Sequence, residues 1–336
     1  MNDLSKLKVS SSPHIRAEDT TGRIMLDVII ALLPALAIGI FVYGLRALTV
    51  TLLSAAACVF FEWTYELLAH KPLTIYDGSA VVTGVLLAFC LPVSVPMWVV
   101  LLGDLFAIVI VKQLFGGIGK NFVNPALAGR AFLLASFAGI VGITPKIRTA
   151  LPLFTTPVDV VTAATPLSQM KSGALPDVSA LQSALGMVGG SIGEISAFAL
   201  LAGGLYLIYR KVISPRIPLA YLGTVALLTF LFPRGNGHVE WMLCQLVSGG
   251  LMLGAIFMAT DYTTSPITRR GQLIFGIGCG AITVLIRYFG TYPEGVSYAI
   301  LVMNLFVPLI ERYTIPRKFG APVKAKKEKG GVKVEK

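Results

Sequence analysis

The chain has 336 residues, of which 55% are hydrophobic and only 13% are charged. This composition and a mean hydropathy of +0.78 exclude a disordered chain and argue strongly against a soluble globule, whose charged fraction is roughly 25%. The net charge of +11 is a positive surplus that nucleic acid, anionic lipid or membrane topology could each explain.

Continuously apolar segments dominate the chain, and a membrane-spanning helix needs about 20 such residues. The segments do not alternate between polar and apolar residues, which excludes a β-barrel. We therefore predict an all-α integral membrane protein of about ten helices, at 24–45, 47–69, 79–93, 96–112, 129–143, 186–208, 217–233, 241–260, 271–290 and 296–311.

The basic residues indicate the orientation. With ten helices both ends lie on one side, and assigning that side to the cytoplasm places 22 of the 28 Lys and Arg there, as the positive-inside rule requires. The tail 312–336 alone carries nine basic and two acidic residues. The surplus is thus interpreted as a topology signal and not as nucleic-acid binding. We expect 1–23 and 312–336 in the cytoplasm and the loop 144–185 outside the cell membrane.

The order of the segments suggests two five-helix halves, 24–143 and 186–311, which must be inverted relative to each other because five is odd. Three segments are short, at 79–93, 129–143 and 296–311, and short helices at matching places point to a central binding site. The stretch 115–126 is rich in Gly, Asn and Pro and predicts irregular backbone. It is either part of such a site or a plain re-entrant loop.

The cysteines and histidines predict no metal site. Cys58, Cys90, Cys244 and Cys279 each lie alone in an apolar run, without the short spacings of a cluster or zinc site. We expect them to be small buried hydrophobes. The three histidines lie outside or at the edges of the apolar runs, which argues against haem bound between helices.

The outer loop carries one chemical motif. Its residues 159–165 resemble the flavinylation motif D-x-x-[ST]-G-A-[ST], whose last hydroxyl takes FMN through a phosphoester. The resemblance implies that Thr165 is the attachment residue. Ala163 stands where the motif has Gly, which affects the backbone angles open to the loop but not the acceptor hydroxyl. The attachment motif comprises Asp159, Thr162, Ala163, Ala164 and Thr165.

Three further blocks, at 76–84, 115–132 and 298–304, occur in the right order. Together with the loop motif they make the chain similar, over about 13–320, to the family of the D subunit of the Rnf electron-transport complex. This family includes the B subunit of the sodium-pumping NADH:quinone oxidoreductase. The resemblance implies an ion-translocating oxidoreductase component that couples electron transfer between ferredoxin and NAD to Na⁺ or H⁺ transport, with other Rnf subunits as partners.

The same resemblance implies cofactors and a maturation partner. A flavin transferase would attach FMN to Thr165, and a second, non-covalent flavin (riboflavin) could lie near Asn121 and Asn124, with Arg130 as a further candidate. The chain shows no nucleotide-binding motif, so we expect neither a NAD site nor a ferredoxin site. We assign no catalytic residue to it.

The residues around Thr165 support this interpretation independently. A threonine hydroxyl is a poor nucleophile without an activating base or metal, which another enzyme could supply to an exposed loop. Pro166 disfavours helix at Thr165 and presents its side chain on extended backbone. The alternative is that Asp159 or Thr162 caps a turn or short helix.

Charges inside apolar runs are a second class of candidate. Asp104 lies near the middle of 96–112, where a charge is costly, so it binds Na⁺, relays a proton, pairs with Arg, or is a hydrogen-bonded side chain facing the bundle. Interfacial positions explain Glu62, Glu66 and Glu194. Arg130 either meets a flavin or anchors a helix in the cytoplasm.

Two other classes of function remain open. Ten helices in inverted halves also suit a solute channel or transporter with urea-transporter-like architecture, since fold alone does not choose function. A scaffold protein of the complex would bind no flavin at all. The motif at 159–165 distinguishes the flavoprotein from both.

Overall fold

The computed structural model describes residues 20–143, 145, 152–153, 165–176, 178–186, 188–235 and 237–316. These residues form helices and connecting segments, without a strand. The first group of helices comprises α1 (Thr21–Tyr43), α2 (Leu45–Leu68), η2 (Ile75–Asp77), α3 (Ser79–Phe89), α4 (Met97–Leu105), η3 (Phe106–Gln113), α5 (Pro125–Ser136) and α6 (Ala138–Val141). After α7 (Pro166–Lys171) and α8 (Ala180–Leu185) follow α9 (Ala197–Tyr209), α10 (Arg216–Leu231), α11 (His238–Val247), α12 (Leu251–Leu253), η4 (Gly254–Met258), α13 (Arg269–Phe289) and α14 (Val296–Thr314).

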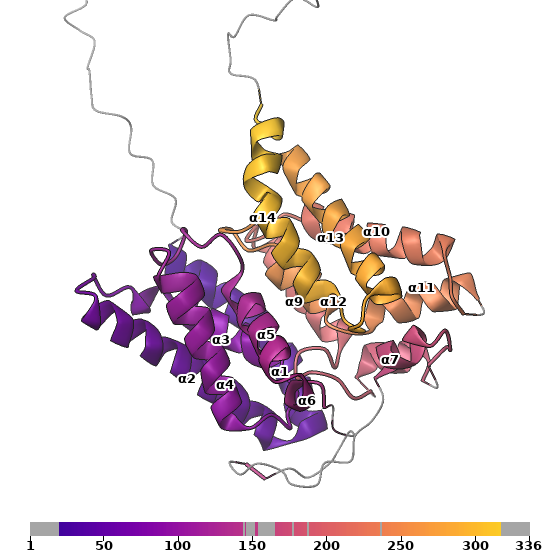
Figure 1. Cartoon of the computed structure of the whole chain (residues 1–336), viewed down its shortest axis with the longest axis horizontal. Coiled ribbons are helices and arrows are strands. Elements are labelled where there is room, and N and C mark those ends of the chain that lie inside the picture. The colour runs from indigo at the N-terminus through magenta and orange to yellow at the C-terminus, as the bar shows by residue number, and fades with distance from the viewer. Residues whose placement is uncertain are drawn as a thin grey trace, which may run out of the picture.

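The early helices α2–α5 gather on one side of the molecule and α10, α11, α13 and α14 on the other (Figure 1). Close helix contacts in each group depend on glycine. A Cβ on Gly84 of α3 would lie 2.7 Å from the Ser54 carbonyl of α2, and one on Gly276 of α13 would lie 2.9 Å from the Ile217 carbonyl of α10. Glycine therefore lets these backbones approach, as is common between membrane helices.

Each group contains a short non-helical segment between two helices that a buried arginine stabilises. Arg46 donates to the carbonyls of Val93 and Val95, at 2.8 and 3.0 Å, in the segment between α3 and α4. Arg287 donates to the Ser248 carbonyl at 3.0 Å where α11 and α12 meet at a bend of 65°. The guanidinium groups thus satisfy carbonyls that lack a helical partner.

The two groups of helices meet along α1 and α9. Gly203 of α9 lies against the Ala31 carbonyl of α1 so closely that no Cβ would fit between them. About one turn earlier in α1, Asp27 accepts a hydrogen bond from Tyr206 at 2.8 Å and pairs with Arg210 at 3.2 Å.

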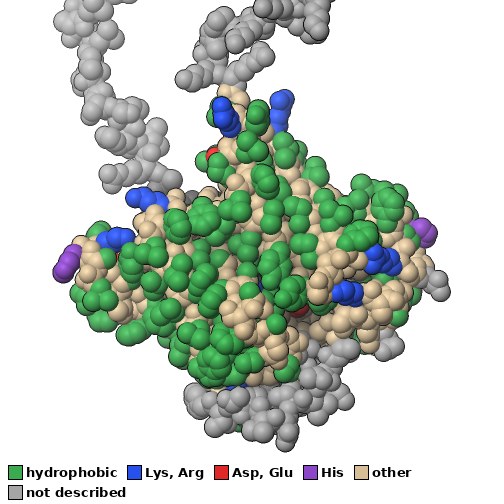
Figure 2. Space-filling model, viewed as in Figure 1, with side chains coloured by type: hydrophobic (Ala, Val, Ile, Leu, Met, Phe, Trp, Pro, Cys, Tyr) green, Lys and Arg blue, Asp and Glu red, His purple; other side chains and the backbone are tan. Residues whose placement is uncertain are grey.

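Hydrophobic side chains cover most of the visible surface, and Lys and Arg lie toward its margins (Figure 2). Large exposed apolar residues, such as Phe41, Leu205 and Phe289, lie on helices of both groups. In the described part of the chain, four helices are long and apolar enough to span a membrane, namely α1, α2, α13 and α14, and the bent pair α11–α12 is a fifth candidate. An apolar exterior of this extent is what a lipid environment requires.

Several predicted segments need correction. The segment expected at 186–208 begins as a helix only at Ala197, because 188–196 is irregular and Gly193 donates to the Phe89 carbonyl at 2.9 Å. The segment expected to be short at 296–311 is the 19-residue α14, which continues past the charged Glu311 and Arg312. The helix expected from 129 begins at Pro125. The loop 144–185, in which no helix was predicted, contains α7 and α8.

Candidate functional site

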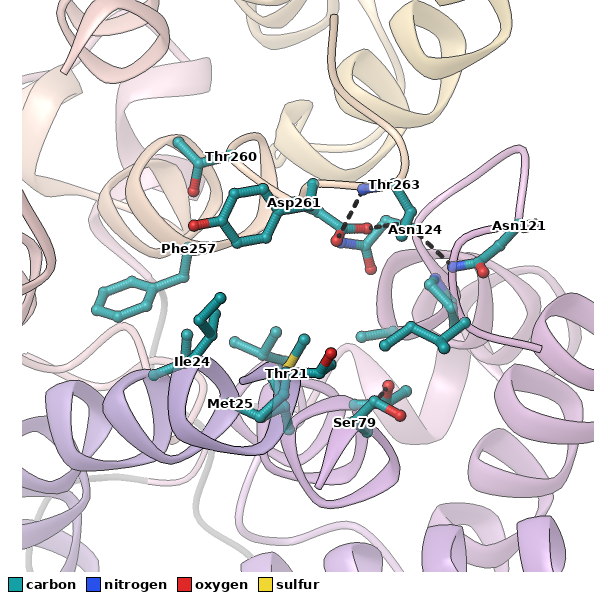
Figure 3. Close-up of a pocket in the computed structure, with 18 of the residues that line it drawn as sticks. Thr21, Ile24, Met25, Ser79, Asn121, Asn124, Phe257, Thr260, Asp261 and Thr263 are labelled. Atoms are coloured by element: carbon teal, nitrogen blue, oxygen red, sulfur yellow. Dashed lines mark hydrogen bonds between the residues drawn. The ribbon is translucent and has the colours of Figure 1, made fainter. Parts of the chain in front are cut away.

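An inner cavity of about 380 Å³ lies between the two groups of helices. Residues of α1 and α3 form one wall and residues 257–263, following α12, form the opposite wall, as Figure 3 shows for Met25 and Ser79 against Asp261 and Thr263. Both asparagines predicted to lie near a ligand, Asn121 and Asn124, line this cavity. Its size and its mainly apolar lining with a few polar groups are typical of small-molecule sites of roughly 300–1,000 Å³.

The irregular segment before α5 places the two asparagines. Gly116, Gly117 and Gly119 take positive φ angles there, which side chains with a Cβ resist. Asn124 caps α5, because its side-chain oxygen accepts from Leu127 N at 3.3 Å. The helix therefore starts at the cavity, and its first residues contribute to the lining.

The asparagine amides connect the first group of helices to the second. Asn124 Nδ2 donates to the Met258 carbonyl at 3.3 Å, and Asn121 Nδ2 donates to Thr263 Oγ1 at 3.3 Å. Asn304 of α14 accepts from Asn124 N at 3.1 Å and donates to the Thr264 carbonyl at 3.0 Å. Asn121 Oδ1 is buried without a partner among the described residues and remains free for a ligand.

Two charged residues that the sequence did not single out also line the cavity. Asp261 accepts from Thr263 Oγ1 at 2.9 Å and from Thr264 Oγ1 at 3.0 Å. Burial raises the pKa of the Asp261 carboxyl, and these two hydroxyls partly oppose that rise. Lys112 of η3 is 2% exposed and provides the ammonium group of the cavity wall.

Glu62 and Glu66, expected at the membrane interface, are buried beside Lys112. Glu62 pairs with Lys112 at 2.6 Å, and its Oε1 also accepts from Gln113 Nε2 at 2.7 Å. Glu66 accepts from the backbone N–H of Thr74 at 2.9 Å. Their depth relative to the membrane interface stays a prediction, and their burial is tolerable because these carboxylates have partners on η3 and the loop after α2.

Thr165 is described, whereas the rest of its motif, 159–164, lies outside the described residues. Its backbone is extended, with φ −69° and ψ 149°, as Pro166 predicts. Its Oγ1 accepts from Ser168 N at 3.3 Å and thereby caps α7. The alternative given by the sequence was that Asp159 or Thr162 caps a turn or short helix, whereas the capping residue in the structure is Thr165. The side chain is partly exposed, and the oxygen serves here as an acceptor.

Thr165 lines a small cavity of about 30 Å³, whose wall also includes Glu194 and Glu294. This space suits one or two waters and not a flavin ring. Arg130 pairs with Glu194 at 3.6 Å and also with Glu294, with a side chain that is 7% exposed. Arg130 is thus a buried ion-pair partner of both carboxylates, and the positions of Arg130 and Glu194 relative to the membrane stay predictions.

Asp104 of α4 is fully buried among neutral partners. It accepts from Ser54 Oγ at 2.6 Å and from Cys58 Sγ at 3.3 Å, while its Oδ2 has no partner among the described residues. The geometry agrees with a hydrogen-bonded side chain facing the bundle. It gives no Arg partner to Asp104 within the described part of the chain.

Comparison with known proteins identifies relatives over the whole of this architecture. The model of the NQR2, RnfD, RnfE family matches residues 8–320. The chain belongs to this family. It is 53% identical to the D subunit of the Na⁺-translocating ferredoxin:NAD⁺ oxidoreductase complex of Acetobacterium woodii, over 98% of this chain and 99% of the relative.

Two further relatives extend the comparison. The D subunit of the proton-translocating ferredoxin:NAD⁺ oxidoreductase complex of Clostridium ljungdahlii is 44% identical over 93% of this chain and 96% of its own length. The D subunit of the ion-translocating oxidoreductase complex of Stutzerimonas stutzeri is 40% identical over 90% of this chain and 93% of its own length. The family match thus includes the inner cavity, both non-helical segments that the arginines stabilise, and Thr165. The family resemblance expected from the sequence motifs is confirmed.

Proposed function

We propose that the chain is the D subunit of an Rnf-type membrane complex, which couples electron transfer between ferredoxin and NAD⁺ to Na⁺ or H⁺ translocation. Near full-length similarity to three subunits named for this type of activity supports the assignment. It also favours an electron-transfer role over a solute channel or a scaffold. The chain would carry electrons through flavins, while other subunits hold the ferredoxin and NAD sites.

The first proposed cofactor is FMN, joined to Thr165 by a phosphoester that a flavin transferase makes. The observation that carries this proposal is the partly exposed threonine on extended backbone at the end of the motif. The small cavity behind Thr165 cannot hold the ring, so an attached flavin would lie on the outer side of the loop. A covalent bond would keep the cofactor from diffusing away.

The second proposed cofactor is a non-covalent riboflavin in the inner cavity, where it would supply one-electron redox chemistry. The apolar side chains of Ile24, Met25 and Phe257 would contact the ring system. The amides of Asn121 and Asn124 would orient it through hydrogen bonds. These residues fit the group, because a flavin has an apolar ring face and a polar edge with both donors and acceptors.

We further propose the topology of ten spans in two inverted halves, with both ends in the cytoplasm and Thr165 outside. The distribution of the basic residues supports the orientation, since it assigns 22 of the 28 Lys and Arg to the cytoplasmic side. A reporter fused after Lys171 should be extracytoplasmic. A cytoplasmic signal would contradict both the helix count and the location of the flavin.

In-gel fluorescence tests the covalent flavin. Protein made with a flavin transferase should fluoresce after denaturation, and Thr165→Val should abolish the signal. Ser172→Ala removes a hydroxyl just beyond the end of α7 and should leave the signal unchanged. Mass spectrometry of the peptide that carries Thr165 should show the FMN increment. A fluorescent Thr165→Val band would exclude this attachment site.

Extraction of the purified protein tests the second flavin. Wild-type protein should release riboflavin on denaturation, and Asn121→Ala should lower the amount at least fivefold. Gln272→Ala changes an amide on α13 outside the cavity lining and should retain full content. Equal riboflavin in Asn121→Ala and wild type would place the cofactor elsewhere.

A further inference from the structure

A short chain of hydrogen bonds leads from a half-buried carboxylate to the inner cavity. Asp77, at the end of η2, accepts from Ser79 Oγ at 2.6 Å and from Ser79 N at 2.8 Å. Ser79 Oγ in turn accepts from Lys112 Nζ at 2.6 Å. Ser79 and Lys112 both line the cavity, whereas Asp77 lies behind them near the beginning of α1 and α3.

The local backbone explains why these three groups meet. Gly78 adopts φ +76° between η2 and α3, which turns the chain so that Asp77 caps the first residue of α3. Ser79 then starts α3 beside the cavity. Lys112 approaches it from η3, a π-helical segment in which the side-chain spacing differs from that of an α-helix.

Several carboxylates lie around the Lys112 ammonium. Glu62 pairs with its ammonium directly, and Gln113 Nε2 bridges Glu62 to Glu66, at 2.7 and 3.5 Å. Asp77 is connected to Lys112 through the Ser79 hydroxyl, and Asp261 lies on the opposite cavity wall. Lys71 donates to the Gln113 carbonyl at 3.3 Å. Lys112 is thus an ammonium held in a buried, largely acidic cluster, at the edge of a site for a redox ligand.

We propose that Asp77, Ser79 and Lys112 form a proton path into the inner cavity. The inference rests on the proposed riboflavin. A flavin that gains an electron becomes more basic at its ring nitrogens, and a ring nitrogen that faces Lys112 would take its proton from that wall of the cavity. A hydroxyl both donates and accepts, so Ser79 can pass a proton in either direction.

The transfer balances along this series of hydrogen bonds. Lys112 Nζ would supply one proton to a flavin that an electron from the complex has reduced, so that one N–H bond of the ammonium breaks and one forms on the ring. The Asp77 carboxylate takes a proton from solvent and passes it to Ser79 Oγ, and Ser79 Oγ gives its own proton to the Lys112 amine. Lys112 is then an ammonium, Ser79 a hydroxyl and Asp77 a carboxylate again, and the net change is one proton moved from solvent to the flavin.

Such a path changes the rate of proton uptake and not the equilibrium. Ser79→Ala removes the relay hydroxyl but leaves the Lys112–Glu62 pair, so riboflavin content and midpoint potential should remain those of the wild type. Proton uptake after rapid flavin reduction should slow at least tenfold. Ser79→Thr keeps a hydroxyl and should restore the rate to within about threefold of the wild type.

The measurement uses the full-length protein with its flavins, in detergent and weak buffer. Stopped-flow reduction with dithionite is followed by flavin absorbance and by a pH-indicator dye, and parallel samples are analysed for extracted riboflavin. A Ser79→Ala protein that retains riboflavin and takes up protons at the wild-type rate overturns the proposal.

A second variant covers the case in which Ser79→Ala fails to fold or to retain riboflavin. Asp77→Asn keeps the size and the acceptor oxygen of Asp77 but cannot carry a proton, so uptake should again slow at least tenfold. An unchanged rate overturns the path while leaving the proposed function intact. Wild-type protein without riboflavin would overturn both, and the extraction result separates the two failures.

Discussion

Arg287 offers a quantitative test of how the bend between α11 and α12 is stabilised. Its guanidinium is 3% exposed and donates to the Gln245 carbonyl at 2.6 Å, to Gln245 Oε1 at 2.9 Å and to the Ser248 carbonyl at 3.0 Å. Arg287→Met leaves three buried acceptors without a donor, each costing about 1–3 kcal/mol. The variant no longer buries a charge, which offsets part of this cost. We therefore expect the free energy of unfolding to fall by about 3–5 kcal/mol.

Thermal unfolding in detergent, followed by intrinsic fluorescence, should show this loss. At about 2 °C per kcal/mol for a chain of this size, the Tm should fall by at least about 6 °C. Arg270→Met changes an exposed arginine on the same helix and serves as the control. Arg287→Lys should be intermediate, because an ammonium cannot reproduce the planar fork. A Tm for Arg287→Met within about 2 °C of the control would refute the proposed role of these hydrogen bonds.

Three further predictions concern buried contacts. Asp104→Asn should lower ion transport by reconstituted complex at least fivefold while flavin content stays constant, and unchanged transport would leave Asp104 a structural side chain. Gly203→Val should prevent folding or lower the Tm by more than about 6 °C, because its branched side chain would occupy the position of the Ala31 carbonyl. Arg130→Met should lower the free energy of unfolding by about 3–5 kcal/mol, because the two carboxylates of Glu194 and Glu294 lose their shared cation. The double variant Arg130→Met/Glu294→Gln should recover part of this stability. A double variant no more stable than Arg130→Met would refute the pairing.

Apolar runs predicted most helix positions to within a few residues, because lipid-facing helices must be apolar along their whole length. The errors occur where the chain satisfies its polar groups through tertiary contacts. Gly193 interrupts the expected helix at 186–208 by donating to Phe89, a residue far earlier in the chain. No local pattern contains this pairing. Likewise, α14 continues through Glu311, where a hydropathy criterion stops.

The candidate site was predicted through its asparagines and not through its charges. Asn121 and Asn124 stand in a conspicuous Gly- and Pro-rich stretch, and Thr165 belongs to a recognisable motif. Lys112 ends an apolar run and resembles an ordinary interfacial lysine until Glu62 and Ser79 are seen beside it. A signal was nevertheless present, since Glu62 and Lys112 are both charges within or at the edge of apolar segments, where burial requires a partner.

The location of the inner cavity has a consequence for assembly. Because its walls come from both groups of helices, any molecule that fills it touches both and stabilises their association. A ligand present at about a thousand times its Kd would add about 4.1 kcal/mol to the stability of the joined form. If that ligand is the proposed riboflavin, protein produced in riboflavin-starved cells would separate more easily along α1 and α9, and degradation of the incompletely loaded chain would act as quality control before it joins its partners.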